Sequence, residues 1–170
     1  MRSDAATVRE VNGHAEAAWK AMLDADLNAR YWRAMVLRFS RREGHAKIFL
    51  AVVASAAVGS WSLWIEAQWL WKTLSAVAAI VSVAMPIIDV PRKTEVMTEA
   101  YAAWLQLMHD YDDLWLGRDK IDEATFVTRL SSLRTREVDV AKKTAKLPSD
   151  DMELSERCYA EVLNSRALSE

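Results

Sequence analysis

The chain has 170 residues and a formal net charge of −2 at pH 7, and a chain of this length ordinarily forms one domain. The near balance of charge neither favours nor excludes a polyanionic partner, so local clusters of charge must decide that question. The single cysteine, Cys158, excludes an intrachain disulfide and has no metal-ligand neighbours. We predict no cleavable signal peptide, because the first 45 residues are rich in charge and the first apolar run begins after them.

The first predicted element is a long helix that runs over about residues 5–42 or continues through Gly44 into the first apolar run. Its apolar residues alternate at spacings of three and four, as in the heptad seam of a coiled coil. They are Val8, Val11, Ala15, Ala18, Met22, Ala25, Ala29, Trp32, Val36 and Phe39. A seam of this length requires a partner helix, and the same spacing returns after Pro91. It comprises Met97, Tyr101, Trp104, Met108, Tyr111 and Trp115. We therefore predict that these two helices pack together, and we assign residues 1–45 to an N-terminal heptad helix.

Two apolar runs between these helices predict a transmembrane hairpin over residues 46–90. Ile48–Ile65 holds eighteen residues without a charge. At about 1.5 Å per residue this is roughly 27 Å of helix, against roughly 30 Å of bilayer hydrocarbon. With flanking residues the spans are about 46–65 and 70–88. Lysines and arginines lie at the outer ends of the hairpin, so the positive-inside rule places both termini in the cytoplasm. The alternative is a buried helical hairpin of a soluble bundle.

Residues 91–170 are predicted to form further cytoplasmic helices. Gly117 suits a helix C-cap and Asp122 suits the next N-cap, so a third cytoplasmic helix is expected between Asp122 and Pro148. A short last helix follows, with Cys158 on its apolar face. No strand is expected, since nothing outside the apolar runs alternates with a period of two. The predicted fold class is all-α, with a two-helix transmembrane hairpin continuous with a cytoplasmic helical stalk and bundle.

Basic residues on the third cytoplasmic helix form the predicted ligand-binding site. Arg129, Arg136 and Lys143 recur every seven residues, which puts them on one helix face. Such a stripe suits phosphate, because arginine binds phosphate bidentately and lysine adds point charge. With the flanking cations, the candidate residues are Arg129, Arg134, Arg136, Lys142, Lys143 and Lys146. The alternative is a solvated helix face, since Asp139 lies in the same row.

The remaining chemistry-bearing residues do not predict catalysis or metal binding. The one cluster of metal-ligating types comprises His109, Asp110, Asp112 and Asp113. Asp110 and Asp112 would point in different directions on a helix, so no metal site is expected. The chain holds no phosphate-loop, dinucleotide-binding, nucleophile-elbow or paired-cysteine motif, so an enzyme is not expected.

Two polar lines run along the predicted spans, and each ends in an acid. The first comprises Ser55, Ser62 and Glu66, and the second comprises Ser75, Ser82 and Asp89. One hairpin encloses no pore, so these residues would line a cation path only if several copies gathered around an axis. The alternative is that they pack helices.

Several local features can be compared with known families. They are the segment Arg30-Tyr31-Trp32-Arg33, the two apolar runs with tryptophans at their connection, the segment Tyr101-x-x-Trp104-Leu105 and the terminal helix around Cys158 after Pro148. Together they resemble the SLATT domain over about residues 30–162. SLATT proteins are two-transmembrane proteins of bacteria, encoded beside SMODS-class nucleotidyltransferases in anti-phage systems.

The resemblance implies a multi-pass effector of the bacterial inner membrane. Its expected activity is that of an oligomeric pore or channel, with a tetramer as the working assumption, that depolarises the membrane. A nucleotide or oligonucleotide made by a partner nucleotidyltransferase would regulate it, and no resident cofactor is expected. The expected partners are the lipid bilayer, further copies of the chain, the nucleotidyltransferase product and the nucleotidyltransferase itself. The alternative is a non-conducting, membrane-anchored adaptor that recruits a partner through its cytoplasmic helices.

Overall fold

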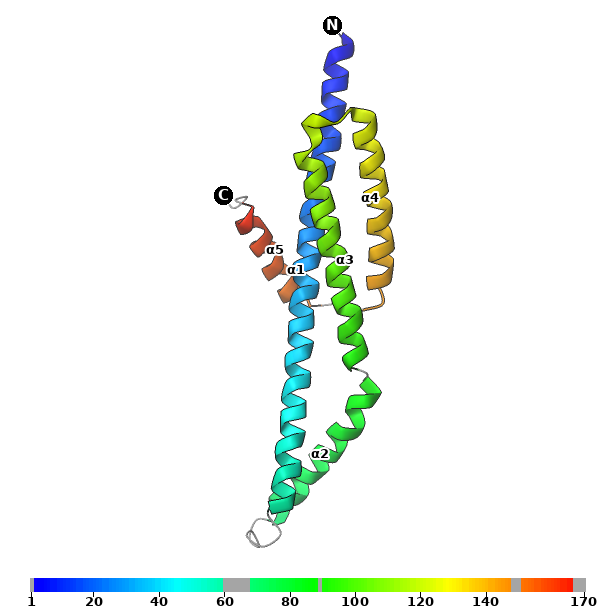
Figure 1. The fold of residues 1–170 in the computed structure, drawn as a ribbon. Coiled ribbons are helices and arrows are strands. Elements are labelled where there is room, and N and C mark those ends of the chain that lie inside the picture. The colour runs from blue at the N-terminus through cyan, green and yellow to red at the C-terminus, as the bar shows by residue number, and fades with distance from the viewer. Residues whose placement is uncertain (1, 60–67, 89, 148–150, 167–170) are drawn as a thin grey trace. The chain divides into compact units, whose positions relative to one another are not determined.

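The computed structural model describes residues 2–59, 68–88, 90–147 and 151–166, and the helices account for nearly all of them. The α-helices are α1 (Arg2–Gly59), α2 (Gln68–Ile88), α3 (Val90–Leu116), α4 (Glu123–Thr144) and α5 (Met152–Ser165), with a short 3-10 helix η2 (Arg118–Lys120) between α3 and α4. Figure 1 shows this order along the chain. The described residues contain no strand, so the predicted all-α class is confirmed.

The chain divides into two compact units. The bundle unit comprises Met1–Ala34 and Met97–Glu170, and the hairpin unit comprises Met35–Val96. Both α1 and α3 contribute to each unit. The predicted boundaries near residues 45 and 90 stay a prediction.

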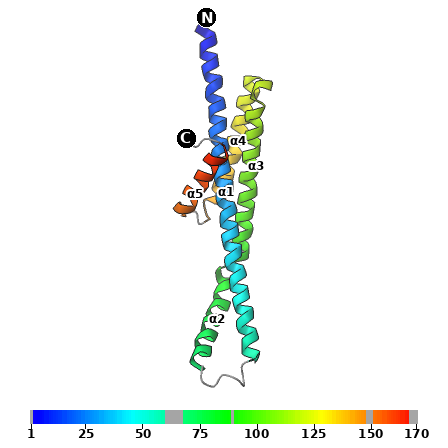
Figure 2. The same ribbon diagram turned by 90° about the vertical axis from the view of Figure 1, so that its left-hand side faces the viewer.

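The core of the bundle unit lies where α1 meets α3. On α1 the buried seam comprises Ala18, Met22, Ala25, Ala29 and Trp32. On α3 it comprises Met97, Ala100, Trp104, Leu107, Tyr111 and Leu114. The ring centroids of Trp19 and Trp115 lie 5.3 Å apart, and Figures 1 and 2 show the two helices side by side. The predicted pairing of the two seams is therefore observed within a single chain, and it buries the α1 seam from Ala18 to Trp32.

Local hydrogen bonds mark the end of α3 and the start of α4. The Gly117 amide donates to the Asp113 carbonyl at 2.9 Å, which closes the last turn of α3. The Asp122 carboxylate accepts from the Thr125 amide at 2.9 Å, so Asp122 is the predicted N-cap of α4. Leu130 is among the buried apolar residues that fix α4 against the bundle. The other two are Phe126 and Leu133.

The predicted location in a membrane is contradicted. Among the residues that the structure describes, no helix is long and apolar enough to cross a membrane. This finding overturns the assignment of a multi-pass protein of the bacterial inner membrane, with spans at about 46–65 and 70–88 and both termini cytoplasmic.

The physical reason is clearest in α1. The apolar run at the end of α1 continues without a break from Arg42, Glu43 and Lys47, whose charges belong to the same helix. Residues 60–67, which the prediction counted within the hairpin, lie outside the described residues.

Candidate functional site

The six predicted ligand-binding cations lie on the exposed surface of α4 and of the turn that follows it. Arg129, Arg134, Arg136, Lys142, Lys143 and Lys146 are all exposed. The neighbouring side of α4, which carries Phe126, Leu130 and Leu133, is buried in the bundle and holds the helix in place. The structure therefore presents these side chains on a fixed element, as a binding surface requires.

Helix geometry separates the six into two groups. Seven residues make almost two full turns, so Arg129, Arg136 and Lys143 follow one line with steps of roughly 10 Å. Lys146 follows the last residue of α4, about one turn beyond Lys143. Arg134 and Lys142 lie about 140° around the helix from Arg129, so they do not share its face. We define the α4 stripe as Arg129, Arg136, Lys143 and Lys146.

One cation of the α4 stripe is already engaged by α3. Arg136 donates through Nη1 to the Asp110 carboxylate, which also accepts from the Gln106 side chain at 2.9 Å. Next to this pair, the Tyr111 hydroxyl donates to Glu137 at 2.7 Å. Burial, followed by this hydrogen bond, raises the pKa of Tyr111 well above its usual range, so the hydroxyl keeps its proton. Both links join α3 to α4, and the pair with Asp110 reduces the charge that Arg136 offers to a ligand.

The other cations differ in their neighbours. Lys142 lies 3.5 Å from Asp139 on the same helix. Arg129, Lys143 and Lys146 have no carboxylate within ion-pair distance in the part of the chain that the structure describes. Within the described residues, these three stripe cations are therefore not engaged in an ion pair.

The acidic residues near the stripe do not form a metal centre. No three side chains of histidine, cysteine, aspartate or glutamate converge as metal ligands within the described ranges. Asp110 pairs with Arg136, whereas Asp112 lies 3.7 Å from Arg166 at the end of α5. The two carboxylates thus serve contacts with different helices.

The structure describes only some of the predicted pore-lining residues. Ser75 and Ser82 are exposed on α2. Ser55 belongs to α1, and its side chain lies outside the described set, as do Ser62, Glu66 and Asp89 altogether. A pore needs a membrane to cross, so the contradicted location removes the basis of this prediction.

Sequence analysis missed a buried ionic cluster that joins α1, α3 and α5. The Asp26 carboxylate is buried and accepts from Arg30 Nε at 2.7 Å. This hydrogen bond is the largest cause of the raised pKa of Arg30. Arg30 also donates to the Ser165 hydroxyl at 2.8 Å, and Arg166 lies 3.7 Å from both Asp26 and Asp112. The one sequence signal was the Asp26–Arg30 spacing of four on a helix. The partners on α5 lie too far along the chain to be inferred.

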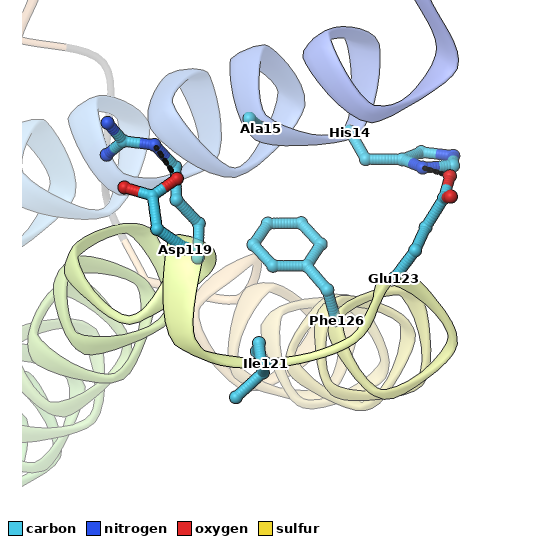
Figure 3. Close-up of a pocket in the computed structure, with 7 residues that line it drawn as sticks. His14, Ala15, Asp119, Ile121, Glu123 and Phe126 are labelled. Carbon is cyan, nitrogen blue, oxygen red and sulfur yellow. Dashed lines mark ion pairs between the residues drawn. The ribbon is translucent and has the colours of Figure 1, made fainter. Parts of the chain in front are cut away.

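A cleft of about 310 Å³ lies where α1, η2 and α4 meet. Figure 3 shows the Phe126 ring at its centre, with His14 and Glu123 on one side and Asp119 on the other. His14 Nδ1 lies 3.8 Å from Glu123, and Arg118 Nε lies 3.8 Å from Asp119. The Arg118 guanidinium also stacks over the Trp115 ring at 4.2 Å. The cleft holds the two carboxylates of Asp119 and Glu123 and one guanidinium, that of Arg118, and His14 adds a positive charge only when it is protonated.

Comparisons with family models, with curated proteins and with solved structures found no match to this chain. The resemblance to the SLATT domain therefore stays an expectation from sequence.

Proposed function

We propose that this chain is a helical adaptor that works by binding rather than by catalysis, and that it binds a nucleotide or oligonucleotide along the α4 stripe. The observation that carries the proposal is the set of three stripe cations without a carboxylate neighbour among the described residues: Arg129, Lys143 and Lys146. Arg136 stands within the same line, with its charge shared with Asp110.

The arrangement favours an extended polyanion over a single small anion. Steps of roughly 10 Å along α4 are too long for one phosphate to bridge two stripe cations. A chain of phosphates can contact them in succession, and each contact releases counterions to solution. An oligonucleotide should therefore bind the α4 stripe more tightly than a mononucleotide does.

The resemblance to the SLATT domain supplies the biological setting for this proposal. It supports a role in anti-phage defence beside a SMODS-class nucleotidyltransferase, whose product would be the ligand. The enzyme itself is a candidate protein partner for the bundle. Binding of the product would then change which partner the adaptor holds.

The test measures binding of a fluorescently labelled single-stranded oligonucleotide by anisotropy over a range of salt concentrations. The Arg129→Glu/Lys143→Glu protein should bind roughly tenfold more weakly or worse, because two attractions become repulsions. Its plot of log affinity against log salt should be shallower by about 0.7 for each phosphate that the variant no longer neutralises.

The matched control is Lys20→Glu/Arg157→Glu. It makes the same change in net charge at two exposed cations outside the stripe. This control should keep the wild-type affinity. Equal weakening of binding in both double variants would show that the affinity depends only on net charge. Salt-insensitive binding by the wild-type chain would reject the proposal.

A further inference from the structure

We propose that the cleft between α1, η2 and α4 holds one base of the bound oligonucleotide, and that Glu123 selects guanine there. This inference rests on the proposed function, because the base is brought to the cleft by phosphates held on the α4 stripe. It adds a site that recognises a base to a surface that otherwise binds phosphate alone.

The cleft lies next to the first cation of the α4 stripe. Phe126 lines the cleft, and Arg129 follows it three residues later on the same helix. Side chains three residues apart on a helix are neighbours, with about 5–6 Å between their Cβ atoms. Helical side chains are also directed toward the N-terminus, so Arg129 extends back toward the turn that carries Phe126. A phosphate held by Arg129 therefore lies close to the cleft.

The size and the walls of the cleft suit a single base. Its volume of about 310 Å³ is at the lower end of the range of roughly 300–1,000 Å³ for small-molecule pockets. Figure 3 shows the Phe126 ring between Ala15 and Ile121, and only 6% of Phe126 is exposed, so the bundle fixes this ring. Aromatic side chains bind the flat face of any base. The sugar and the phosphates would stay outside the cleft.

The charges of the cleft disfavour a phosphate and permit a neutral base. The two carboxylates of Asp119 and Glu123 outnumber the one guanidinium, that of Arg118. Arg118 is also engaged by Trp115, because it stacks over that ring at 4.2 Å and donates to the Trp115 carbonyl at 3.1 Å. The carboxylates repel a phosphate. A base has no net charge, and its N–H groups are donors that a carboxylate accepts.

Glu123 is the carboxylate best placed to bind the edge of a base. His14 Nδ1 lies 3.8 Å from it, which is beyond hydrogen-bond distance, so Glu123 keeps its acceptor capacity within the described part of the chain. The Glu123 side chain is 36% exposed and therefore partly enclosed by the cleft. The Asp119 side chain is 82% exposed and lies 3.8 Å from Arg118. We therefore assign base recognition to Glu123.

Guanine is the base whose edge matches a carboxylate. Its ring N–H and its neighbouring amino group are two adjacent donors, and one carboxylate can accept from both at once, as it does from arginine. Adenine and cytosine present one amino group beside an acceptor nitrogen, and thymine presents one ring N–H between two carbonyl groups. A bidentate pair of this kind discriminates against the wrong base by roughly 5- to 150-fold.

The experiment compares labelled oligothymidines of equal length that carry one guanine, adenine or hypoxanthine at the end opposite the label. Each end of the oligonucleotide is tested in turn, and binding is measured by anisotropy. The wild-type chain should bind the guanine oligonucleotide roughly tenfold more tightly than the adenine oligonucleotide. Hypoxanthine is guanine without the amino group, so its oligonucleotide should bind with an affinity between these two.

The variant Glu123→Gln separates base recognition from phosphate binding. The amide keeps one acceptor oxygen and replaces the other by a donor, so the preference for guanine should fall to about twofold or less. Loss of a negative charge favours phosphate, so the adenine oligonucleotide should bind as tightly as it does to wild type, or slightly more tightly. The matched control Glu156→Gln makes the same change in net charge at an exposed residue of α5 and should keep the preference for guanine. Urea unfolding checks that both variants are folded.

Four results are decisive against this inference. Equal affinities of the wild-type chain for the guanine and adenine oligonucleotides would overturn it, and the proposed function would stand if Arg129→Glu/Lys143→Glu still weakened both. A preference that survives in Glu123→Gln would place base recognition elsewhere. Loss of the preference in Glu156→Gln would make it an effect of net charge. If no oligonucleotide binds, the proposed function and this inference fail together.

Discussion

Replacing Asp26 by alanine should destabilise the bundle unit by about 2–3 kcal/mol. The carboxylate is buried and accepts two hydrogen bonds from Arg30, at 2.7 and 3.3 Å, with Arg166 at 3.7 Å. Hydrogen bonds to charged groups contribute about 1.5–3 kcal/mol. The larger cost of about 3–5 kcal/mol for breaking a fully buried pair does not apply. Both arginines remain partly exposed, and they keep Ser165 and Asp112 as partners.

The assay is urea unfolding followed by circular dichroism, with a thermal melt beside it. For a chain of this length the expected loss lowers the melting temperature by roughly 5–10 °C. Asp26→Asn should lose less, because the amide oxygen still accepts from Arg30. The control Asp24→Ala removes an exposed carboxylate two residues earlier and should change stability by no more than about 0.5 kcal/mol. Equal stabilities for Asp26→Ala and Asp24→Ala would refute the view that this cluster fixes α5 to α1.

Three further changes test other parts of the bundle unit. Because the pKa of Tyr111 is raised, its contribution to the free energy of unfolding is fully present below the unfolded pKa near 10 and should be lost as the pH rises above that value. This loss should be smaller in Tyr111→Phe and should persist in Tyr159→Phe. Urea titrations at pH 9 and pH 11 measure it. Leu130→Ala should cost about 2–5 kcal/mol in urea unfolding, and a loss below 1 kcal/mol would show that α4 is not part of the core. Asp151→Ala removes the side chain that accepts from the Leu154 amide at the start of α5, so it should lower the free energy of unfolding by about 1 kcal/mol. An unchanged midpoint of urea unfolding would contradict this prediction.

The helices and their main pairing could be predicted because their signals are local. The alternation of threes and fours from Ala18 to Trp32 depends only on which side of one helix is buried. Gly117 and Asp122 act within a single turn, so their capping roles could also be predicted.

Long-range contacts could not be predicted in the same way. The pair between Asp110 and Arg136 depends on the register of two helices, and Arg166 reaches Asp26 only after α5 has packed against α1. The exposure of the six cations agrees with the general rule that lysine and arginine stay in contact with water, whereas their division into engaged and unengaged residues could not be predicted.

The error over the membrane has a physical cause as well. A run of apolar residues signals that a helix is covered, but hydropathy alone does not distinguish lipid from a protein surface. Ile80 and Val83 carry that signal, and both are exposed on α2 in the single chain.

The engaged state of Arg136 allows a test in which binding should improve. Asp110→Asn removes the charge that holds Arg136, so the α4 stripe should gain a fourth unpaired cation. We expect tighter oligonucleotide binding at low salt and a salt dependence steeper by about 0.7. The pair is partly exposed, so its removal should cost stability no more than about 1 kcal/mol.

The matched control is Asp139→Asn, which makes the same change in net charge and frees Lys142 instead. Lys142 lies about 140° around α4 from Arg129 and about 120° from Arg136, so a ligand that contacts both arginines should not gain a contact with Lys142, and the affinity should stay close to wild type. If both variants tighten binding equally, the affinity for the oligonucleotide depends on net charge and the binding site is not on α4. If neither does, Arg136 does not contact the ligand even when it is free, and the stripe is a solvated helix face. Only a gain confined to Asp110→Asn agrees with phosphates placed along Arg129, Arg136 and Lys143.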